Sequence, residues 1–222
     1  MLANVNRPIV FTVSALVAAM IAAGGCWYAL RTQPATAGIK PEDLSSPTTI
    51  KSDYGNLPLS FESNRGQTDS VVKFLARSNG YALFLTSDEA VFRFQNKHNS
   101  SDSSVLRMSL KDANRSPLVT GLSELPGKTN YFIGNDPKTW RTDIPTYARV
   151  RYESIYPGVD LIYHSTQGRQ LEYDFVVAVG ADPHQIKLGF SGADEVELLN
   201  GDLVIKDEGR EMRMHKPAVY QE

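Results

Sequence analysis

The sequence predicts an all-β fold, an antiparallel β-sandwich-like module over residues 57–222. Short runs of Val, Ile, Leu, Phe and Tyr recur through this region. Gly, Pro, Asn or Asp interrupts them roughly every eight to twelve residues, as between strands. Helical periodicity is nearly absent, and many short strands without intervening helices favour a sandwich or barrel over a parallel sheet. At 222 residues the chain is long enough for one sizeable domain or two small ones.

The N-terminal region, residues 1–30, has a different composition from the rest. An uncharged, mainly apolar run from Ile9 to Leu30 lies between Arg7 and Arg31. As a helix this run would be about 33 Å long, enough to cross a bilayer. The pattern therefore predicts an apolar signal peptide or membrane-anchor helix.

Three ways of processing this segment are compatible with the sequence. Ala35 and Ala37 offer an A-x-A site for cleavage after Ala37. The run "AAGGC" resembles a bacterial lipobox that ends at Cys26, and residues 9–30 are also long enough to remain as an uncleaved anchor. Each outcome predicts an extracytoplasmic module, either secreted or tethered to the cell envelope through residues 9–30. The membrane would then be contacted through this N-terminal segment alone.

Residues 31–56 follow as a flexible linker. They are rich in Pro, Thr, Ser and Gly and show no apolar periodicity. Such a composition cannot bury enough surface to fold by itself.

The strands are expected in order from residue 57 onward. In 105–110, Leu106, Met108 and Leu110 alternate with polar or exposed positions, so one face is apolar. Asn200 and Gly201 separate two apolar runs, which is a strong hairpin signal. A Gly- and Pro-containing stretch, 123–128, would be the hinge if the module consists of two packed subdomains. The expected strands are 71–77, 80–86, 90–94, 105–110, 117–122, 129–134, 146–152, 159–164, 171–177, 186–190, 195–199, 202–206, 211–215 and 218–220.

The strands 159–164 and 171–177 are expected to form a hairpin around the link Ser165–Arg169. The facing pairs would be Tyr163 with Leu171, Leu161 with Tyr173, and Asp160 with Asp174. Because opposed carboxylates repel, we expect Arg149 or Arg151 of the preceding strand to neutralise them. The acids would then be structural, and a metal is the weaker alternative because so few oxygen ligands make a poor calcium site.

Several function classes lack support in the sequence. The 23 basic and 25 acidic residues form no block of one sign, so no nucleic-acid partner is expected. The four histidines are scattered, and Cys26 is the single cysteine, so neither a zinc site, a disulfide nor a thiol nucleophile is expected. No serine-hydrolase elbow, phosphate loop or EF-hand spacing occurs. No cofactor or metal is predicted.

Five residues are weak candidates for a binding site. Glu172 and Asp174 are two apart on one expected strand, so they share a face about 7 Å apart, a separation that suits paired-carboxylate glycoside chemistry. A solvated strand face is the favoured interpretation of both, and Asp160 could complete such a pair. Trp140, beside Arg141 in a loop, could stack on a sugar or anchor a partner. We expect Trp140 instead to fold back and cap the core.

Long segments of the chain resemble a known bacterial module. They are "LPLSFESNRGQTDSVVKFLARSNGYALFL", "LPGKTNYFIGNDPKTWRTDIPTYARVRYESIYPGVDLIYH" and "LEYDFVVAVGADP". The sequence resembles the N-terminal domain of unknown function found ahead of SBBP-type β-propeller repeats in exported and surface proteins. The resemblance implies an extracytoplasmic, mainly β module and supplies no catalytic residues. Relatives continue into propeller repeats, which this sequence lacks, so the module either stands alone or belongs to a truncated relative.

The expected function is a non-enzymatic exported β module of a bacterial cell-surface protein, serving adhesion, ligand binding or structural organisation. Its partner would be a surface glycan or a protein. The alternative is a carbohydrate-active enzyme that uses Glu172 with Asp174 or Asp160.

Overall fold

The computed structural model describes residues 9–18, 58–78, 80–95, 103–166, 170–207 and 210–221. These residues form strands and two short 3-10 helices, η2 (Pro137–Thr139) and η3 (Pro183–Gln185). The strands are β1 (Ile9–Ala18), β2 (Phe61–Ser63), β3 (Phe74–Arg77), β4 (Tyr81–Leu85), β5 (Glu89–Gln95), β6 (Ser103–Leu110), β7 (Leu118–Tyr131), β8 (Arg141–Tyr156), β9 (Val159–Ser165), β10 (Leu171–Val177), β11 (Leu188–Ser191), β12 (Glu195–Leu199), β13 (Asp202–Asp207), β14 (Arg210–Met214) and β15 (Ala218–Gln221).

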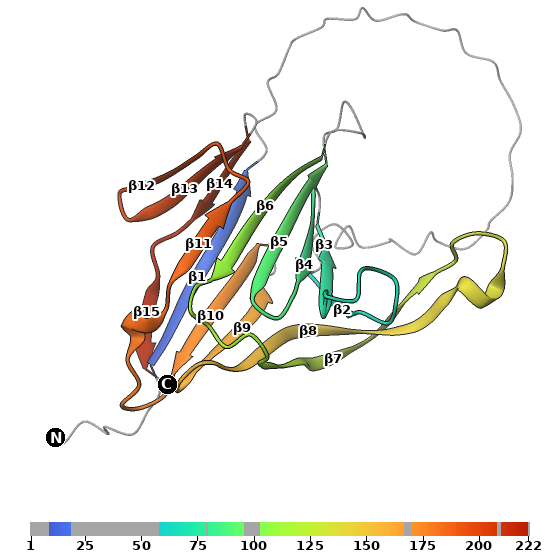
Figure 1. The fold of residues 1–222 in the computed structure, drawn as a ribbon, viewed down its shortest axis with the longest axis horizontal. Coiled ribbons are helices and arrows are strands. Elements are labelled where there is room, and N and C mark those ends of the chain that lie inside the picture. The colour runs from blue at the N-terminus through green and yellow to red at the C-terminus, as the bar shows by residue number, and fades with distance from the viewer. Residues whose placement is uncertain are drawn as a thin grey trace, which may run out of the picture.

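All the strands belong to one antiparallel sheet (Figure 1). Its order is β11-β6-β5-β4-β3-β2-β8-β9-β10-β1-β14-β13-β12, with β15 paired to β1 and β7 paired to β8. Consecutive strands are mostly neighbours, as short hairpin connections require. The long hairpin β7–β8 projects from the body of the molecule, and its outer end carries η2. We call this outer end, residues 132–140, the arm tip.

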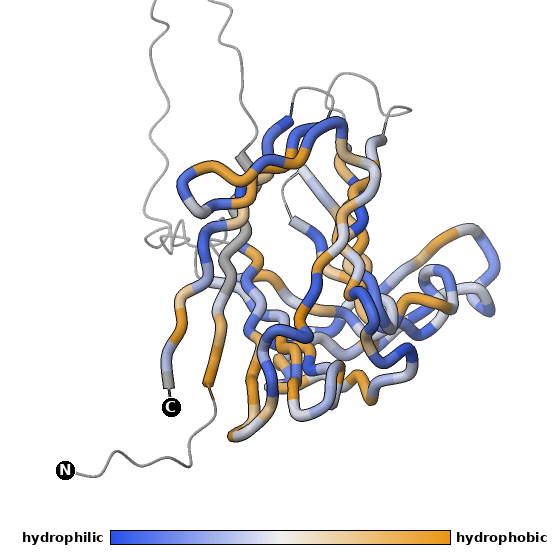
Figure 2. The backbone as a smooth tube through the Cα atoms, turned by 60° about the vertical axis from the view of Figure 1, so that its left-hand side comes forward, coloured by the Kyte–Doolittle hydropathy of each residue, from blue (hydrophilic) through white to orange (hydrophobic). Residues whose placement is uncertain are grey.

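A single hydrophobic core joins the strands of this sheet. The sheet folds over so that residues of β3–β6 pack with residues of β8–β10 and β13–β14 in one buried cluster. Alternation of apolar and polar residues along the strands is visible in Figure 2. The cluster extends from Leu59 to Met214, so the described module has one core and not the two subdomains considered above.

Buried tyrosines tie β8 to its neighbours. The rings of Tyr152, Tyr163 and Tyr173 follow one another across β8, β9 and β10, with centroids 5.7 and 5.9 Å apart. The Tyr152 hydroxyl donates to the Thr86 carbonyl at 2.6 Å, beyond the end of β4. Burial raises the pKa of all three tyrosines, which therefore stay neutral.

Most strand predictions are confirmed. The dry face of β6 is buried as expected, and Asn200 and Gly201 both take positive φ angles in the turn between β12 and β13. The hinge prediction is wrong, because 117–122, 123–128 and 129–134 mostly belong to one strand, β7. Residues between Glu124 and Lys128 form a bulge in its pairing with β8.

The helix prediction at the N-terminus is wrong for residues 9–18, which form β1. Its first residues, "IVFTV", are β-branched or aromatic. All five pair with β10, and Ile9–Thr12 also pair with β15 on the other side. No helix within the described ranges is long and apolar enough to cross a membrane. The remainder of residues 1–30, Cys26, the linker 31–56 and the cleavage position after Ala37 lie outside the described residues.

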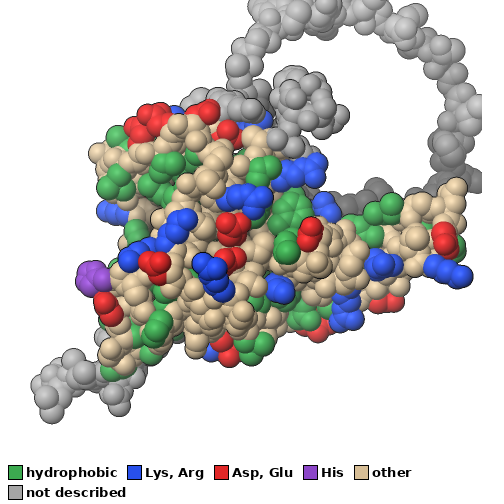
Figure 3. All heavy atoms as spheres, viewed as in Figure 1, with side chains coloured by type: hydrophobic (Ala, Val, Ile, Leu, Met, Phe, Trp, Pro, Cys, Tyr) green, Lys and Arg blue, Asp and Glu red, His purple; other side chains and the backbone are tan. Residues whose placement is uncertain are grey.

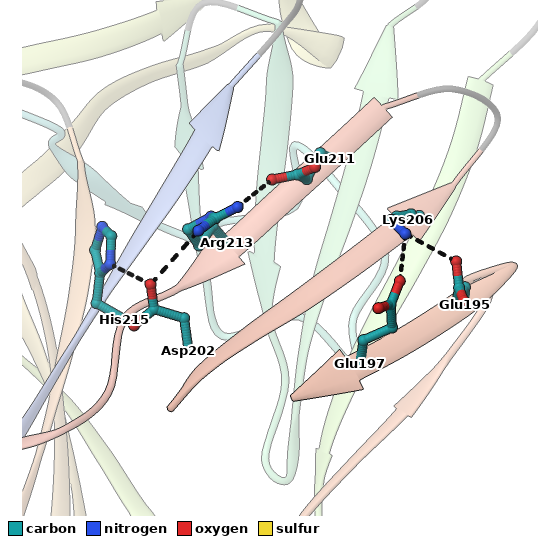
Figure 4. A network of polar contacts seen from close by, with 7 residues as sticks. All are labelled: Glu195, Glu197, Asp202, Lys206, Glu211, Arg213 and His215. Atoms are coloured by element: carbon teal, nitrogen blue, oxygen red, sulfur yellow. Dashed lines mark hydrogen bonds and ion pairs between the residues drawn. The ribbon is translucent and has the colours of Figure 1, made fainter. Parts of the chain in front are cut away.

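Charged side chains are interspersed on the surface. In the view of Figure 3, Lys and Arg side chains lie among Asp and Glu side chains without an extended region of one sign. A polar network runs across β12, β13 and β14 (Figure 4). Lys206 binds Glu195 and Glu197, while Asp202 accepts a hydrogen bond from His215 and pairs with Arg213. These surface pairs, most of them between partly exposed side chains, link neighbouring strands and contribute little stability each.

Candidate ligand pocket and arm tip

A pocket of about 570 Å³ lies beside the bulge of β7. This volume falls in the range of about 300–1,000 Å³ typical of small-molecule sites. Its walls come from four segments: the chain before β2, the β7 bulge, β8 and the end of β9. The lining residues are Pro58, Leu59, Ser60, Leu125, Pro126, Gly127, Thr146, Ala148, Arg149, His164 and Ser165.

The pocket has apolar walls and few polar groups free to meet a ligand. The Thr146 hydroxyl donates to the Gly127 carbonyl at 2.7 Å, which fixes the bulge over the pocket. The Ser165 hydroxyl accepts from the Leu59 backbone N–H at 2.8 Å. Arg149 is exposed. The positive charge of its guanidinium helps to lower the pKa of Asp174. The arrangement suits a small ligand with an apolar body and an anionic or hydrogen-bond-accepting group.

His164 connects this pocket to the two acids predicted as candidates. Its Nε2 lies 2.9 Å from Asp174 Oδ2, and its Nδ1 lies 3.7 Å from Glu172 Oε2. Burial tends to raise the pKa of Asp174, but the hydrogen bond from His164, together with the Thr12 hydroxyl and the charge of Arg149, holds it below its usual range. Asp174 is therefore ionised at neutral pH, and the His164 nitrogen that faces it carries a proton. The sheet thus presents an oriented imidazole at the pocket wall.

The hairpin β9–β10 forms, but its predicted register is wrong by two residues. Tyr163 pairs with Tyr173, Glu172 with His164, and Asp174 with Ile162. A shift of two keeps the same residues buried, so hydrophobic alternation cannot distinguish the two registers. The observed one separates Asp160 from Asp174 and places His164 between the acids.

Asp160 is neutralised by an arginine of β8, as predicted. Its Oδ2 accepts from Arg151 Nε and Nη2 at 3.0 and 2.7 Å, and its Oδ1 accepts from the Ser154 backbone N–H at 2.8 Å. Both carboxylate oxygens are thus occupied at a bulge where Ser154 has a φ of 51°. Asp160 faces Val176 and contributes nothing to the pocket.

Trp140 lies at the arm tip and does not cap the core. Its ring packs edge-on against Phe132, with centroids 5.1 Å apart, and its Nε1 donates to the Gly134 carbonyl at 3.1 Å. Trp140 is 36% exposed and Ile133 is 67% exposed, so the arm tip presents an apolar surface. The hairpin carries this residue away from the core, which is why the expectation from residue type alone was wrong.

Arg141 has a structural position. Its Nη1 donates to the carbonyls of Thr139 and Trp140 at 3.1 and 3.2 Å, next to the end of η2. Its Nε also lies 3.1 Å from the position that a side-chain carbon on Gly66 would occupy. The guanidinium therefore lies beside the turn after β2, and its Nη1 is bound within the arm.

Sequence reasoning missed the pocket because two of its walls were assigned other roles. Leu125, Pro126 and Gly127 lie in the stretch predicted as a hinge, and His164 is one of four scattered histidines for which the sequence predicts no site. The alternation that places His164, Glu172 and Asp174 on one face of a hairpin was the available signal. Within the described ranges, no group of three or more His, Cys, Asp or Glu side chains has the arrangement of a metal site.

Comparison with known proteins yields a family and no assigned activity. A family model described as domain of unknown function (DUF7948) matches residues 61–222. No curated protein and no solved structure matches the chain.

Proposed function

We propose that this chain, which belongs to the family of the domain of unknown function DUF7948, is a non-enzymatic, exported ligand-binding module. The observation that carries the proposal is the pocket of about 570 Å³ with Arg149 and His164 in its wall. Export is supported by the apolar run Ile9–Leu30 and the A-x-A site that ends at Ala37. The resemblance to modules ahead of propeller repeats supports a place in a larger cell-surface protein.

The ligand class follows from the lining. Pro58, Leu59, Leu125, Pro126 and Ala148 supply aliphatic walls, and the lining contains no Phe, Tyr or Trp ring on which a sugar would stack. Arg149 supplies a cation with a planar donor set that matches a carboxylate. We therefore propose small aliphatic carboxylates as the ligands.

A titration of the isotope-labelled full chain with butyrate and hexanoate tests this proposal by amide NMR. We expect shifts at the amides of the pocket, and at least a tenfold weaker affinity in Arg149→Ala. Arg115→Ala, which removes an exposed arginine outside the pocket, is the matched control and should bind as the wild type does. Shifts elsewhere, or equal affinity in the Arg149→Ala variant, would refute the pocket as the site.

A role in adhesion has its own supporting observation in the arm tip. Phe132, Ile133 and Trp140 are exposed together at the end of a projecting hairpin, and aromatic residues in such positions are common anchors of protein interfaces. A Trp140→Ala variant should lose binding to the cell surface while its response to butyrate is unchanged. If the Trp140→Ala variant bound the cell surface as the wild type does, the arm tip would have no role in adhesion.

The enzymatic alternative has weaker support in this geometry. Glycoside hydrolysis needs one carboxyl whose pKa is raised so that it can donate a proton. The pKa of Asp174 is lowered, and Asp160 is bound by Arg151 and Ser154. A hydrolysis screen that finds turnover, abolished by Glu172→Gln, would overturn the non-enzymatic proposal.

A further inference from the structure

Strand β1 is held by pairing on both of its edges. Seven residues, Ile9–Ala15, pair with β10 on one side. On the other side Ile9–Thr12 pair with β15, and Ala15–Ala18 pair with β14. Figure 1 shows β1 running between β10 and the C-terminal strands. No pairing between β10 and β14 or β15 is found among the described strands, so β1 alone joins them.

The side chains described at the start of β1 match this position. Val10 is 3% exposed, and Phe11, which lies across from Phe175, packs against the hydrophobic core. Thr12 lies across from Asp174, and its hydroxyl is 3.4 Å from the Tyr220 hydroxyl. The place between β10 and β15 therefore fits an uncharged extended segment in which two apolar residues are followed by one with a hydroxyl group.

The covalent link between β1 and the rest of the sheet is long. Residues 19–60 separate β1 from β2, and the predicted cleavage after Ala37 falls within this stretch. Cleavage would leave β1 attached by strand pairing alone. Its departure would open a slot bordered by two strand edges, β10 on one side and β14–β15 on the other. Open edges of this kind pair readily with another extended chain.

We propose that this slot is a strand-acceptor site, which takes an extended, uncharged apolar segment of another polypeptide in place of residues 9–18. The acceptor supplies unpaired backbone groups on both edges and a buried position for the side chain that replaces Val10. The inference rests on the proposed export, because cleavage after Ala37 releases the segment that fills the slot. The slot shares no lining residue with the pocket, whose lining includes no residue of β1, β10, β14 or β15.

Strand exchange on the full chain tests this proposal. A protease site is placed between residues 40 and 50, and the folded protein is cut there. A fluorescent peptide with the sequence of residues 7–18 is then added in about 100-fold excess. We expect the cut protein to take up the peptide and to release its own N-terminal fragment, detected by mass spectrometry. The uncut protein should take up at least tenfold less, because its own β1 stays covalently tethered beside the slot.

A peptide with Phe11→Asp is the matched control, since a carboxylate at that position would face the core, and its uptake should be negligible. Equal uptake by cut and uncut protein would place the binding elsewhere and overturn the proposal. A fragment that stays bound for days without exchange would make β1 a permanent strand, and a fragment that leaves without peptide uptake would show that the slot accepts nothing. Failure of the pocket would appear separately, as an unchanged response to butyrate in Arg149→Ala.

Discussion

Asp160 shows how a single acid in the sheet is used for structure. Its carboxylate holds Arg151 through one oxygen and the backbone of the β8 bulge at Ser154 through the other. Hydrogen bonds that involve a charged group contribute about 1.5–3 kcal/mol each when buried, and less where water competes. Loss of this carboxylate leaves both donors without their acceptor. Because the carboxylate is only partly exposed, water replaces it incompletely.

We therefore expect Asp160→Ala to lower the free energy of unfolding by about 2 kcal/mol. Urea denaturation followed by tryptophan fluorescence measures it. Glu153→Ala is the control: Glu153 lies 3.6 Å from the same arginine in an exposed pair, and its loss should cost less than about 0.5 kcal/mol. Equal effects of the two substitutions would contradict the role given to Asp160.

Asp174 gives the module a pH-dependent contribution to stability. The pKa of its carboxyl is lower in the folded chain than the ordinary value of 3.8. A lowered folded pKa means that the contribution is fully present above the unfolded value and is lost as pH falls through the folded one. His164 and Arg149 are the charged or titratable groups that act on it, and Glu172 lies against the other nitrogen of His164.

Asp174→Asn should accordingly be less stable than the wild type at pH 7, by about 1 kcal/mol. The difference should shrink as the pH falls below 3.8, where the wild-type carboxyl takes up its proton. Thermal melts of both proteins between pH 2.5 and pH 7 measure the difference. If the stability difference between the wild type and Asp174→Asn grew toward low pH, it would contradict an ionised Asp174 that stabilises the fold.

At the scale of the elements, β7 and β8 approach each other closely at Gly121. A side-chain carbon at this position would lie 2.5 Å from the ring of Tyr147, which packs edge-on against Phe74. Such a carbon must displace a half-buried ring at the edge of the core. Overpacking of this kind typically costs about 1–3 kcal/mol.

Gly121→Ala should therefore destabilise the module by about that amount, read from chemical denaturation. Gly127→Ala is the matched control in the same strand, because nothing lies within 4 Å of the added carbon. Its stability should stay within about 0.5 kcal/mol of the wild type. A Gly121→Ala variant as stable as the control would mean that the ring of Tyr147 moves aside freely.

Hydrophobic alternation and turn residues in the sequence predict most of the strands. They do not predict how the residues of the site are arranged. Alternation determines which face of β9 and β10 is buried, yet it is unchanged by a shift of two residues, so the neighbours of Asp174 were assigned incorrectly. Proline and glycine at 126–127 indicated a break, whereas the structure absorbs them as a bulge within β7. Hydrophobicity at residues 9–18 fits a membrane helix and a buried strand equally well, and only pairing partners distinguish them.

In the whole molecule, one sheet with one core carries three separate surfaces: the pocket, the arm tip and the slot of β1. The pocket lies beside the β7 bulge, the arm tip stands at the end of the projecting hairpin, and the slot of β1 lies on the other side of β9 and β10. No disulfide stabilises the described strands, since the single cysteine of the sequence is Cys26. The stability of the described strands therefore depends on their common core.

We propose that this module works outside the cytoplasm after its N-terminal segment has been cut from the sheet. The most direct measurement is the intact mass and N-terminal sequence of the full chain expressed in an export-competent bacterium and fractionated into cytoplasm, envelope and medium. We expect an extracytoplasmic protein whose folded module begins at Gly38, the residue after the A-x-A site. A chain that begins at Met1 and remains in the cytoplasm would contradict it.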